Sequence, residues 1–134
     1  MRVLLDTNVL IAAFIAHGTC HELLESVARN HELVSSKYIL GELEDRLRYK
    51  FKFTKKEARD AVGLISERAE VVTPVEVETA SPIDPDDLPV LGSAVAGSCD
   101  CLVTGDKELQ KLGHVEEIPI ISPSQFWKLE DEEL

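Results

Sequence analysis

Short apolar runs that stop at an acid or a hydroxyl side chain recur along this chain, and segments with helical patterns separate them. The first run covers residues 3–5 and is ended by Asp6, and the others cover residues 32–35, 71–72, 101–104 and 118–121. Strands that alternate with helices in this way build a mostly parallel sheet with helices on both faces. We therefore expect an α/β domain of three layers, with the sheet in the middle.

The helices are predicted from apolar spacing and from capping signals. Thr54 and Glu57 form a capping box, so a helix should begin there and continue to Arg68. Residues 74–89 are rich in proline and lack periodicity, which predicts a loop. Asp86 or Asp87 can then cap a helix that runs to Gly97. The other helices are expected at residues 9–14, 20–30, 37–47 and 107–112, and from residue 122 onwards.

Length and composition fit one globular domain over residues 1–134. The chain has 44% hydrophobic and 29% charged residues, which is enough for one core. Its longest apolar stretches fall well short of the ~20 residues that a membrane helix needs. The N-terminus lacks the apolar stretch and cleavage site of a signal peptide. We expect a cytoplasmic protein with no membrane segment, in which residues 128–134 form an acidic tail.

The charges are distributed unevenly. The net charge of −11 argues against a protein that grips nucleic acid with its whole surface. Residues 1–69 nevertheless carry a net charge of +1 and residues 70–134 a net charge of −12. A basic and aromatic segment could follow an RNA backbone, with Tyr49 and Phe53 free to stack on bases. Its candidate RNA-binding residues are Arg46, Arg48, Lys50, Lys52, Lys55 and Lys56. The alternative is a solvated helix–loop–helix whose aromatic residues lie partly in the core.

Two acids stand at the ends of predicted strands. Asp6 closes the first strand, and Asp106 follows the strand at residues 101–104. In open α/β sheets the functional crevice lies beyond the carboxyl ends of the strands. Either acid alone could be a turn former or a helix cap, but two of them from strands that could be neighbours suggest a shared site.

Two further acids are weaker candidates. Asp87 stands at the start of a helix, where the dipole favours an anion, but capping alone would explain it, and Asp84 and Asp86 are close by. Glu42 lies at the edge of the apolar face of its helix, so helical periodicity permits it without selecting it over Glu44. A solvated helix charge is the alternative for Glu42.

Several carboxylates in one place constrain the chemistry. They raise one another's pKa unless a cation neutralises them, so a cluster of acids makes sense as a metal site. A ligand set made only of oxygen atoms suits Mg²⁺ or Mn²⁺. Such ions can activate a water and stabilise the charge that develops when a phosphodiester is hydrolysed.

Four segments together resemble the PIN-domain nucleases. They are residues 4–11 (LLDTNVLI), the helix that carries Glu42, residues 84–97, and residues 100–109 (DCLVTGDKEL). The match looks closest to the toxins of prokaryotic toxin–antitoxin pairs and extends from Val3 to about Trp127. The resemblance implies a parallel sheet of about five strands and a ribonuclease site that depends on Mg²⁺ or Mn²⁺. It also implies a homodimer that an antitoxin holds inactive.

The resemblance also implies roles for individual residues. The family's metal-binding and catalytic acids match Asp6, Glu42, Asp87 and Asp106 of this sequence. Asp87 is preferred to its neighbours because it stands seven residues before Ala94. Asn8 and Thr104 match polar positions that orient the acids. Leu88 and Pro89 depart from the family pattern, which leaves Asp84 and Asp86 open as the third acid.

Two other functions remain open at this point. The chain could be a catalytically weak PIN-fold module that binds a protein or RNA partner, with its acidic half facing a basic segment. It could instead transfer phosphate through an aspartyl group, although Asn8 stands where such phosphatases need a second acid, and Lys107 follows Asp106 too closely for a receiver domain.

Overall fold

A six-stranded sheet forms the centre of the computed structural model, which describes residues 1–16 and 18–133. The strands lie in the order β3-β2-β1-β4-β6-β5. They are β1 (Arg2–Leu5), β2 (Glu32–Ser36), β3 (Glu70–Val72), β4 (Cys101–Val103), β5 (His114–Val115) and β6 (Ile118–Ile121). Every pairing is parallel except that of β5 with β6. The mostly parallel sheet is thereby confirmed. It has one strand more than expected, because the two-residue β5 is too short to leave a pattern in the sequence.

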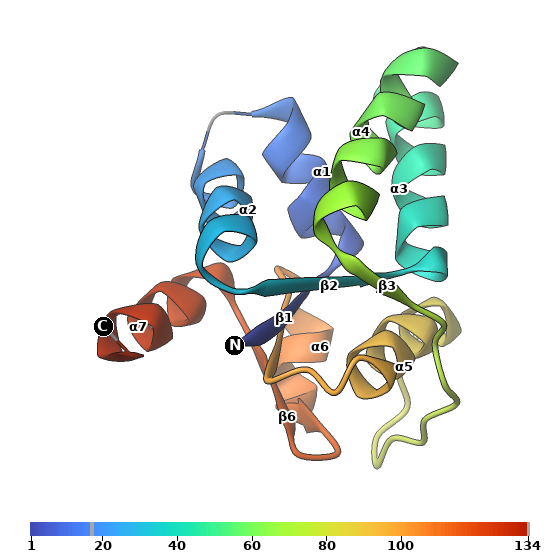
Figure 1. The fold of residues 1–134 in the computed structure, drawn as a ribbon. Coiled ribbons are helices and arrows are strands. Elements are labelled where there is room, and N and C mark those ends of the chain that lie inside the picture. Colours follow the sequence, from blue (N-terminus) through green and yellow to red (C-terminus); the bar gives the residue numbers. More distant parts are fainter. Residues whose placement is uncertain (17, 134) are drawn as a thin grey trace.

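Helices cover both faces of the sheet, as the three-layer prediction requires (Figure 1). They are α1 (Thr7–Ile15), α2 (Thr19–Asn30), α3 (Lys37–Tyr49), α4 (Lys55–Arg68), α5 (Leu88–Ala96), α6 (Lys107–Leu112) and α7 (Pro123–Glu133). Helices α1 to α4 gather on one side of the sheet, and α5 and α6 lie on the other (Figure 1). Helix α7 packs against α2. No helix within the described part of the chain is long and apolar enough to cross a membrane.

The start of α4 follows its predicted capping signal, whereas the start of α5 does not. The Thr54–Glu57 capping box is present and begins α4 as predicted. The prediction that Asp86 or Asp87 caps the helix after the proline-rich loop is wrong. A 3₁₀ turn, η1 (Pro85–Asp87), comes first, and Asp84 caps it by accepting a hydrogen bond from the N–H of Asp86. Asp87 occupies the N-cap position of α5, but its side chain caps nothing. The early turn forms because Pro85 is preorganised for a first helical position.

The segment between β3 and η1 passes close to α5. The N–H of Val75 donates a hydrogen bond to the carbonyl oxygen of Gly92, at 3.3 Å. A Cβ atom at position 92 would overlap the Val75 carbonyl oxygen, so only glycine lets the two backbones approach this closely. This contact fixes the chain shortly before it reaches Asp84 and Asp87.

The predicted acidic tail is helical over its described residues, and Leu134 lies outside them. Glu130 is buried in α7 and accepts hydrogen bonds from the Ser26 hydroxyl, at 2.7 Å, and the His31 ring, at 2.8 Å. Phe126, one turn earlier, is fully buried and packs edge-on against the same His31 ring. The acids near the C-terminus therefore include one that anchors α7 to α2 and to the turn before β2.

Candidate metal centre

The sheet order brings the two strand-end acids together. Strands β1 and β4 are neighbours, and Leu5 pairs with Val103, so Asp6 and Asp106 emerge at the same edge of the sheet. Strand β2 lies on the other side of β1 and leads into α3, which carries Glu42. Asp87 approaches from the end of η1. Four separate segments therefore supply the four acids.

Asp6 is the most deeply buried of these acids, with 7% of its surface exposed. One carboxylate oxygen accepts a hydrogen bond from the Thr7 N–H at 2.7 Å, and the other accepts one from the Thr104 hydroxyl at 2.7 Å. The same Thr104 oxygen accepts a hydrogen bond from the N–H of Asp106. Thr104 thus joins the two strand-end acids, in a position from which it can orient Asp6.

Glu42 is held by neighbours on both of its oxygens. The Thr7 hydroxyl donates to one oxygen at 2.7 Å, and Arg46 donates to the other at 2.9 Å. The Tyr38 hydroxyl contacts Glu42 at 3.3 Å and also donates to the backbone oxygen of Asp86. The carboxylate therefore faces the centre in a fixed position. Thr7 and Tyr38 were not predicted as site residues. The position of Thr7 next to Asp6, and the four-residue spacing of Tyr38 from Glu42 on one helix, could have suggested them.

Arg46, a predicted RNA-binding residue, contacts residues of the centre and keeps 38% of its side chain exposed. Besides its contact with Glu42, its guanidinium donates to the side-chain oxygen of Asn8 at 2.9 Å. A planar guanidinium can hold two acceptors at fixed positions, which an ammonium group does less well. Arg46 therefore links Asn8 to Glu42.

Burial and the charges of neighbouring acids disfavour the ionised forms of Asp87 and Asp6. Burial raises the pKa of Asp87 to about 6, with further contributions from the charges of Asp106, Asp6, Asp84 and Glu42. Burial also raises the pKa of Asp6. Hydrogen bonds from Thr104 and Thr7 lower it, and the charges of Glu42 and Asp106 raise it further. Glu42 and Asp106 are thus close enough for their charges to raise the pKa of both Asp6 and Asp87.

The donor chemistry fits a divalent cation. One Asp106 oxygen caps α6 by accepting from the Glu108 N–H at 2.8 Å, which leaves the other oxygen available. Asp87 caps nothing, whereas Glu42 is engaged on both oxygens. Asp87 and Asp106 are therefore better suited to direct coordination than Glu42, whereas Asp6, which also accepts a hydrogen bond on each oxygen, would bind a cation through its remaining lone pairs. Within residues 1–16 and 18–133, no three His, Cys, Asp or Glu side chains already stand in an arrangement that would hold a metal ion. Binding would require these side chains to converge further.

The aromatic side chains of the basic and aromatic segment differ in exposure, and RNA binding by this segment stays a prediction. Tyr49 is 66% exposed at the end of α3, with the Arg48 guanidinium 5.0 Å above its ring. Phe51 and Phe53 instead pack against the core. Tyr49 is therefore open to a base, whereas the two phenylalanines hold the connection between α3 and α4 in place.

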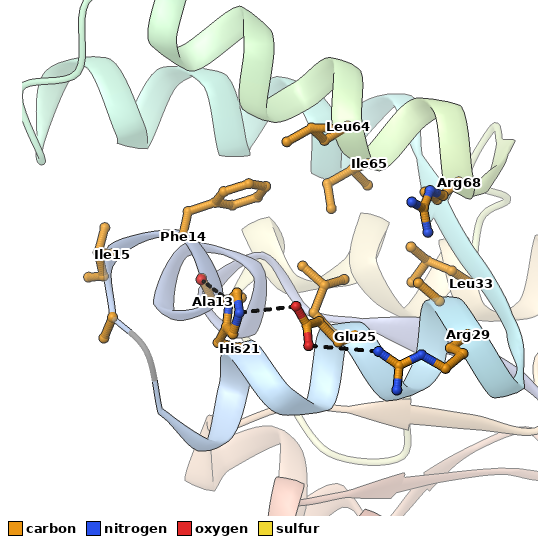
Figure 2. A pocket seen from close by; sticks show the side chains of 13 residues that line it. Ala13, Phe14, Ile15, His21, Glu25, Arg29, Leu33, Leu64, Ile65 and Arg68 are labelled. Atoms are coloured by element: carbon orange, nitrogen blue, oxygen red, sulfur yellow. Dashed lines mark hydrogen bonds and ion pairs between the residues drawn. The ribbon is translucent and has the colours of Figure 1, made fainter.

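A separate groove of about 670 Å³ lies away from the acids, between α1, α2 and α4 (Figure 2). Its apolar lining is Phe14, Ile15, Leu24, Leu33, Leu64 and Ile65, of which Ile15 and Leu64 are among the exposed large hydrophobic residues of the chain. Glu25 and Arg29 pair along its α2 side, and Arg68 reaches in from α4 (Figure 2). An apolar groove with a charged margin suits a protein segment better than a metal or a phosphate.

Comparisons with known proteins agree with this architecture. One similar structure is VapBC2 from Rickettsia felis bound to a DNA fragment from its promoter. A chain of it has 19% identity to this chain and a TM-score of 0.65, and the match covers 91% of this chain and 98% of that one. A chain of VapBC-1 from nontypeable Haemophilus influenzae has 22% identity and a TM-score of 0.66, with coverages of 92% and 99%. A chain of FitAcB from Neisseria gonorrhoeae has 17% identity and a TM-score of 0.59, with coverages of 91% and 98%.

These likenesses show a shared fold. No curated protein sequence matches the chain closely enough to serve as a relative. The PIN-domain family model, however, matches residues 2–108, which include all four acids of the candidate centre. The chain therefore belongs to the PIN-domain family, which is a family of nucleases.

Proposed function

We propose that this protein is a metal-dependent endoribonuclease that acts in the cytoplasm as the toxin of a toxin–antitoxin pair. The observation that carries the proposal is the convergence of Asp6, Glu42, Asp87 and Asp106 from four segments. They lie close enough that the charges of Glu42 and Asp106 raise the pKa of Asp6, and the charges of Asp106, Asp6 and Glu42 raise the pKa of Asp87. Such repulsion is unfavourable for folding, so it is expected where function requires it. Membership of the PIN-domain family supports the nuclease part of the proposal.

Each acid has a separate role in this proposal. Asp6, Asp87 and Asp106 would hold Mg²⁺ or Mn²⁺, which when bound polarises a phosphodiester and activates water. Glu42, fixed by Thr7 and Arg46, positions the attacking water. Thr104 keeps Asp6 turned toward the centre through its hydroxyl. Tyr49 and the cations near the end of α3 bind the RNA strand beside the cut.

RNA cleavage with Mn²⁺ tests the mechanism. Replacing Asp6 by Asn keeps an oxygen for the Thr7 N–H, so α1 stays capped, but removes the charge that a cation needs. We expect Asp6→Asn and Asp87→Asn each to lower kcat by roughly a hundredfold or more. Asp45→Asn, at an exposed position on α3, is the control and should cleave like wild type. Equal activity in wild type and Asp6→Asn would refute the mechanism.

The groove between α1, α2 and α4 supports the partner part of the proposal. An antitoxin segment with an apolar face would cover Ile15 and Leu64 and meet the charges of Glu25 and Arg68. Leu64→Asp should abolish co-purification with the product of an adjacent small reading frame and leave RNA cleavage unchanged. Retained co-purification would place the partner elsewhere. The proposed homodimer would be measured in the same samples by light scattering.

The groove also favours a second candidate, a PIN-fold module that binds a partner with little or no turnover. The absence of a ready metal arrangement among the described residues is compatible with it. Binding of Mn²⁺ separates the two functions. A wild-type protein that binds the partner, fails to bind Mn²⁺ and cuts no RNA would be the binding module.

A further inference from the structure

A second cleft, of about 480 Å³, borders the acidic centre and has no role in the proposal so far. Asp87 and Asp106 line it. The rest of its lining comes from the end of the proline-rich loop, at residues 81–84, and from helix α6 with Glu108, Lys111 and Leu112. The cleft therefore shares two acids with the centre and extends away from it.

The sheet order places this cleft opposite the basic segment. Helix α3, with Glu42 and Arg46, follows β2, whereas α6 follows β4, and these strands flank β1 on its two sides. An RNA strand that crosses the acids from the α3 side would reach the cleft next. The nucleotide beside the cut phosphate would then lie between residues 81–84 and α6.

The lining of the cleft combines apolar side chains with an exposed charged pair. Pro82, Ile83 and Leu112 offer surfaces against which a flat ring can pack. Glu108 and Lys111 stand 3.6 Å apart on α6, with 78% and 76% of their side chains exposed. Such an exposed pair contributes little to stability, so both groups can turn to a ligand at low cost.

We propose that this cleft binds the nucleobase next to the cut phosphate and selects guanine over uracil. The proposal rests on the ribonuclease function proposed above. A carboxylate only accepts hydrogen bonds, and guanine presents the N1–H and the amino group side by side as donors. The neighbouring O6 of guanine is an acceptor, which the Lys111 ammonium can reach while Glu108 takes the two donors. Uracil offers one donor between two carbonyl groups and leaves the carboxylate only partly satisfied.

The cleavage pattern tests the selection. Short RNAs that differ only in the base on one side of the cut should show wild-type kcat/KM higher for guanine than for uracil by roughly tenfold or more. Glu108→Gln replaces one acceptor by a donor and should reduce this ratio to near one, whereas Glu67→Gln, an exposed position on α4, should preserve it. An unchanged ratio in Glu108→Gln would overturn the proposal.

Direct binding separates this proposal from the nuclease function. In NMR titrations of the full chain with Mg²⁺, 5′-GMP should shift the amide signals of Ser81, Ile83 and Leu112, and 5′-UMP should shift them less. That result in a protein that cuts no RNA would support the base site and refute the nuclease function. Cleavage without base preference, together with GMP shifts that avoid these amides, would refute the base site and leave the nuclease function intact.

Discussion

Asp87 has to be ionised to bind a cation in the proposed mechanism, but folding disfavours its ionised form. Its pKa rises from 3.8 to about 6 on folding, first through burial and then through the charges of its neighbours. The folded protein thus holds this proton more tightly than the unfolded chain does. Ionised Asp87 therefore lowers the free energy of unfolding as pH increases from 3.8 towards 6.

Asp87→Asn removes this conflict, and we expect it to stabilise the protein when EDTA removes divalent cations. The variant should melt a few degrees (about 2–6 °C) above wild type at pH 7.5 and near the wild-type temperature at pH 4. Added Mn²⁺ should raise the wild-type Tm more than that of the variant. A Tm difference that stays constant across this pH range would contradict the assignment of the shift to Asp87.

Arg46 was predicted to bind RNA, but its contacts with Asn8 and Glu42 indicate a positioning role. Arg46→Lys should then lower kcat by roughly tenfold or more with little change in KM, because one ammonium cannot hold both acceptors in place. If Arg46 acted only on the RNA backbone, Lys would restore activity, and Arg46→Ala would raise KM instead.

Short sequence patterns around each residue predicted only part of the candidate site. Asp6 and Asp106 could be predicted because each follows an apolar strand, and the position of a strand end depends on a short stretch of sequence. The hydrogen bond between Thr104 and Asp6 joins residues 98 positions apart. No periodicity encodes a contact at that distance. Glu42 could not be selected over Glu44 for the same reason, since what distinguishes it is its contact with Thr7 of another element.

At the scale of elements, Gly92 in α5 decides how the loop before Asp87 is held. Alanine usually stabilises a helix interior relative to glycine by roughly 0.5–1 kcal/mol. At position 92, however, the added Cβ would overlap the Val75 carbonyl oxygen. Gly92→Ala should lower Tm and RNA cleavage together. Gly63→Ala, in α4 with open space around the new Cβ, should raise Tm and leave cleavage unchanged. A higher Tm in Gly92→Ala would show that the loop contact is dispensable.

Helix α7 gives one acid near the end of the chain a packing role that composition does not reveal. The run of acids predicted an acidic tail, and within it Glu130 is buried against Ser26 and His31, which lie about a hundred positions earlier. Glu130→Ala would leave these donors unsatisfied and should reduce the free energy of unfolding by about 1–3 kcal/mol. Asp131→Ala, one residue on and exposed, should change it by less than about 0.5 kcal/mol. Urea denaturation of both variants measures the difference.

At the scale of the whole molecule, binding of RNA has to overcome a net charge of −11. Asp87, Asp106 and Glu108 belong to the acidic half, so phosphates that approach the centre are repelled until a cation neutralises it. Arg46 is held in the centre by Glu42 and Asn8, and the charge of Lys56 is compensated by that of Asp60, so neither adds net positive charge for the RNA backbone. The cations left at the end of α3, in the following connection and at the start of α4 are Arg48, Lys50, Lys52 and Lys55.

The number of these cations, four, determines how strongly RNA binding is expected to depend on salt concentration. Each phosphate contact on a single strand contributes about −0.7 to the slope of log K against log salt concentration, so four cations give a slope of about −3. Fluorescence anisotropy with Ca²⁺ in place of Mn²⁺ would measure binding while limiting cleavage. Replacing Lys50 and Lys55 by Glu should reduce the magnitude of the slope by about half, because two of the four contacts are lost. Lys128→Glu, exposed on α7, is the control and should leave the slope unchanged. A wild-type slope near zero would mean that the strand avoids this segment, and a slope steeper than about −6 would require a second basic surface.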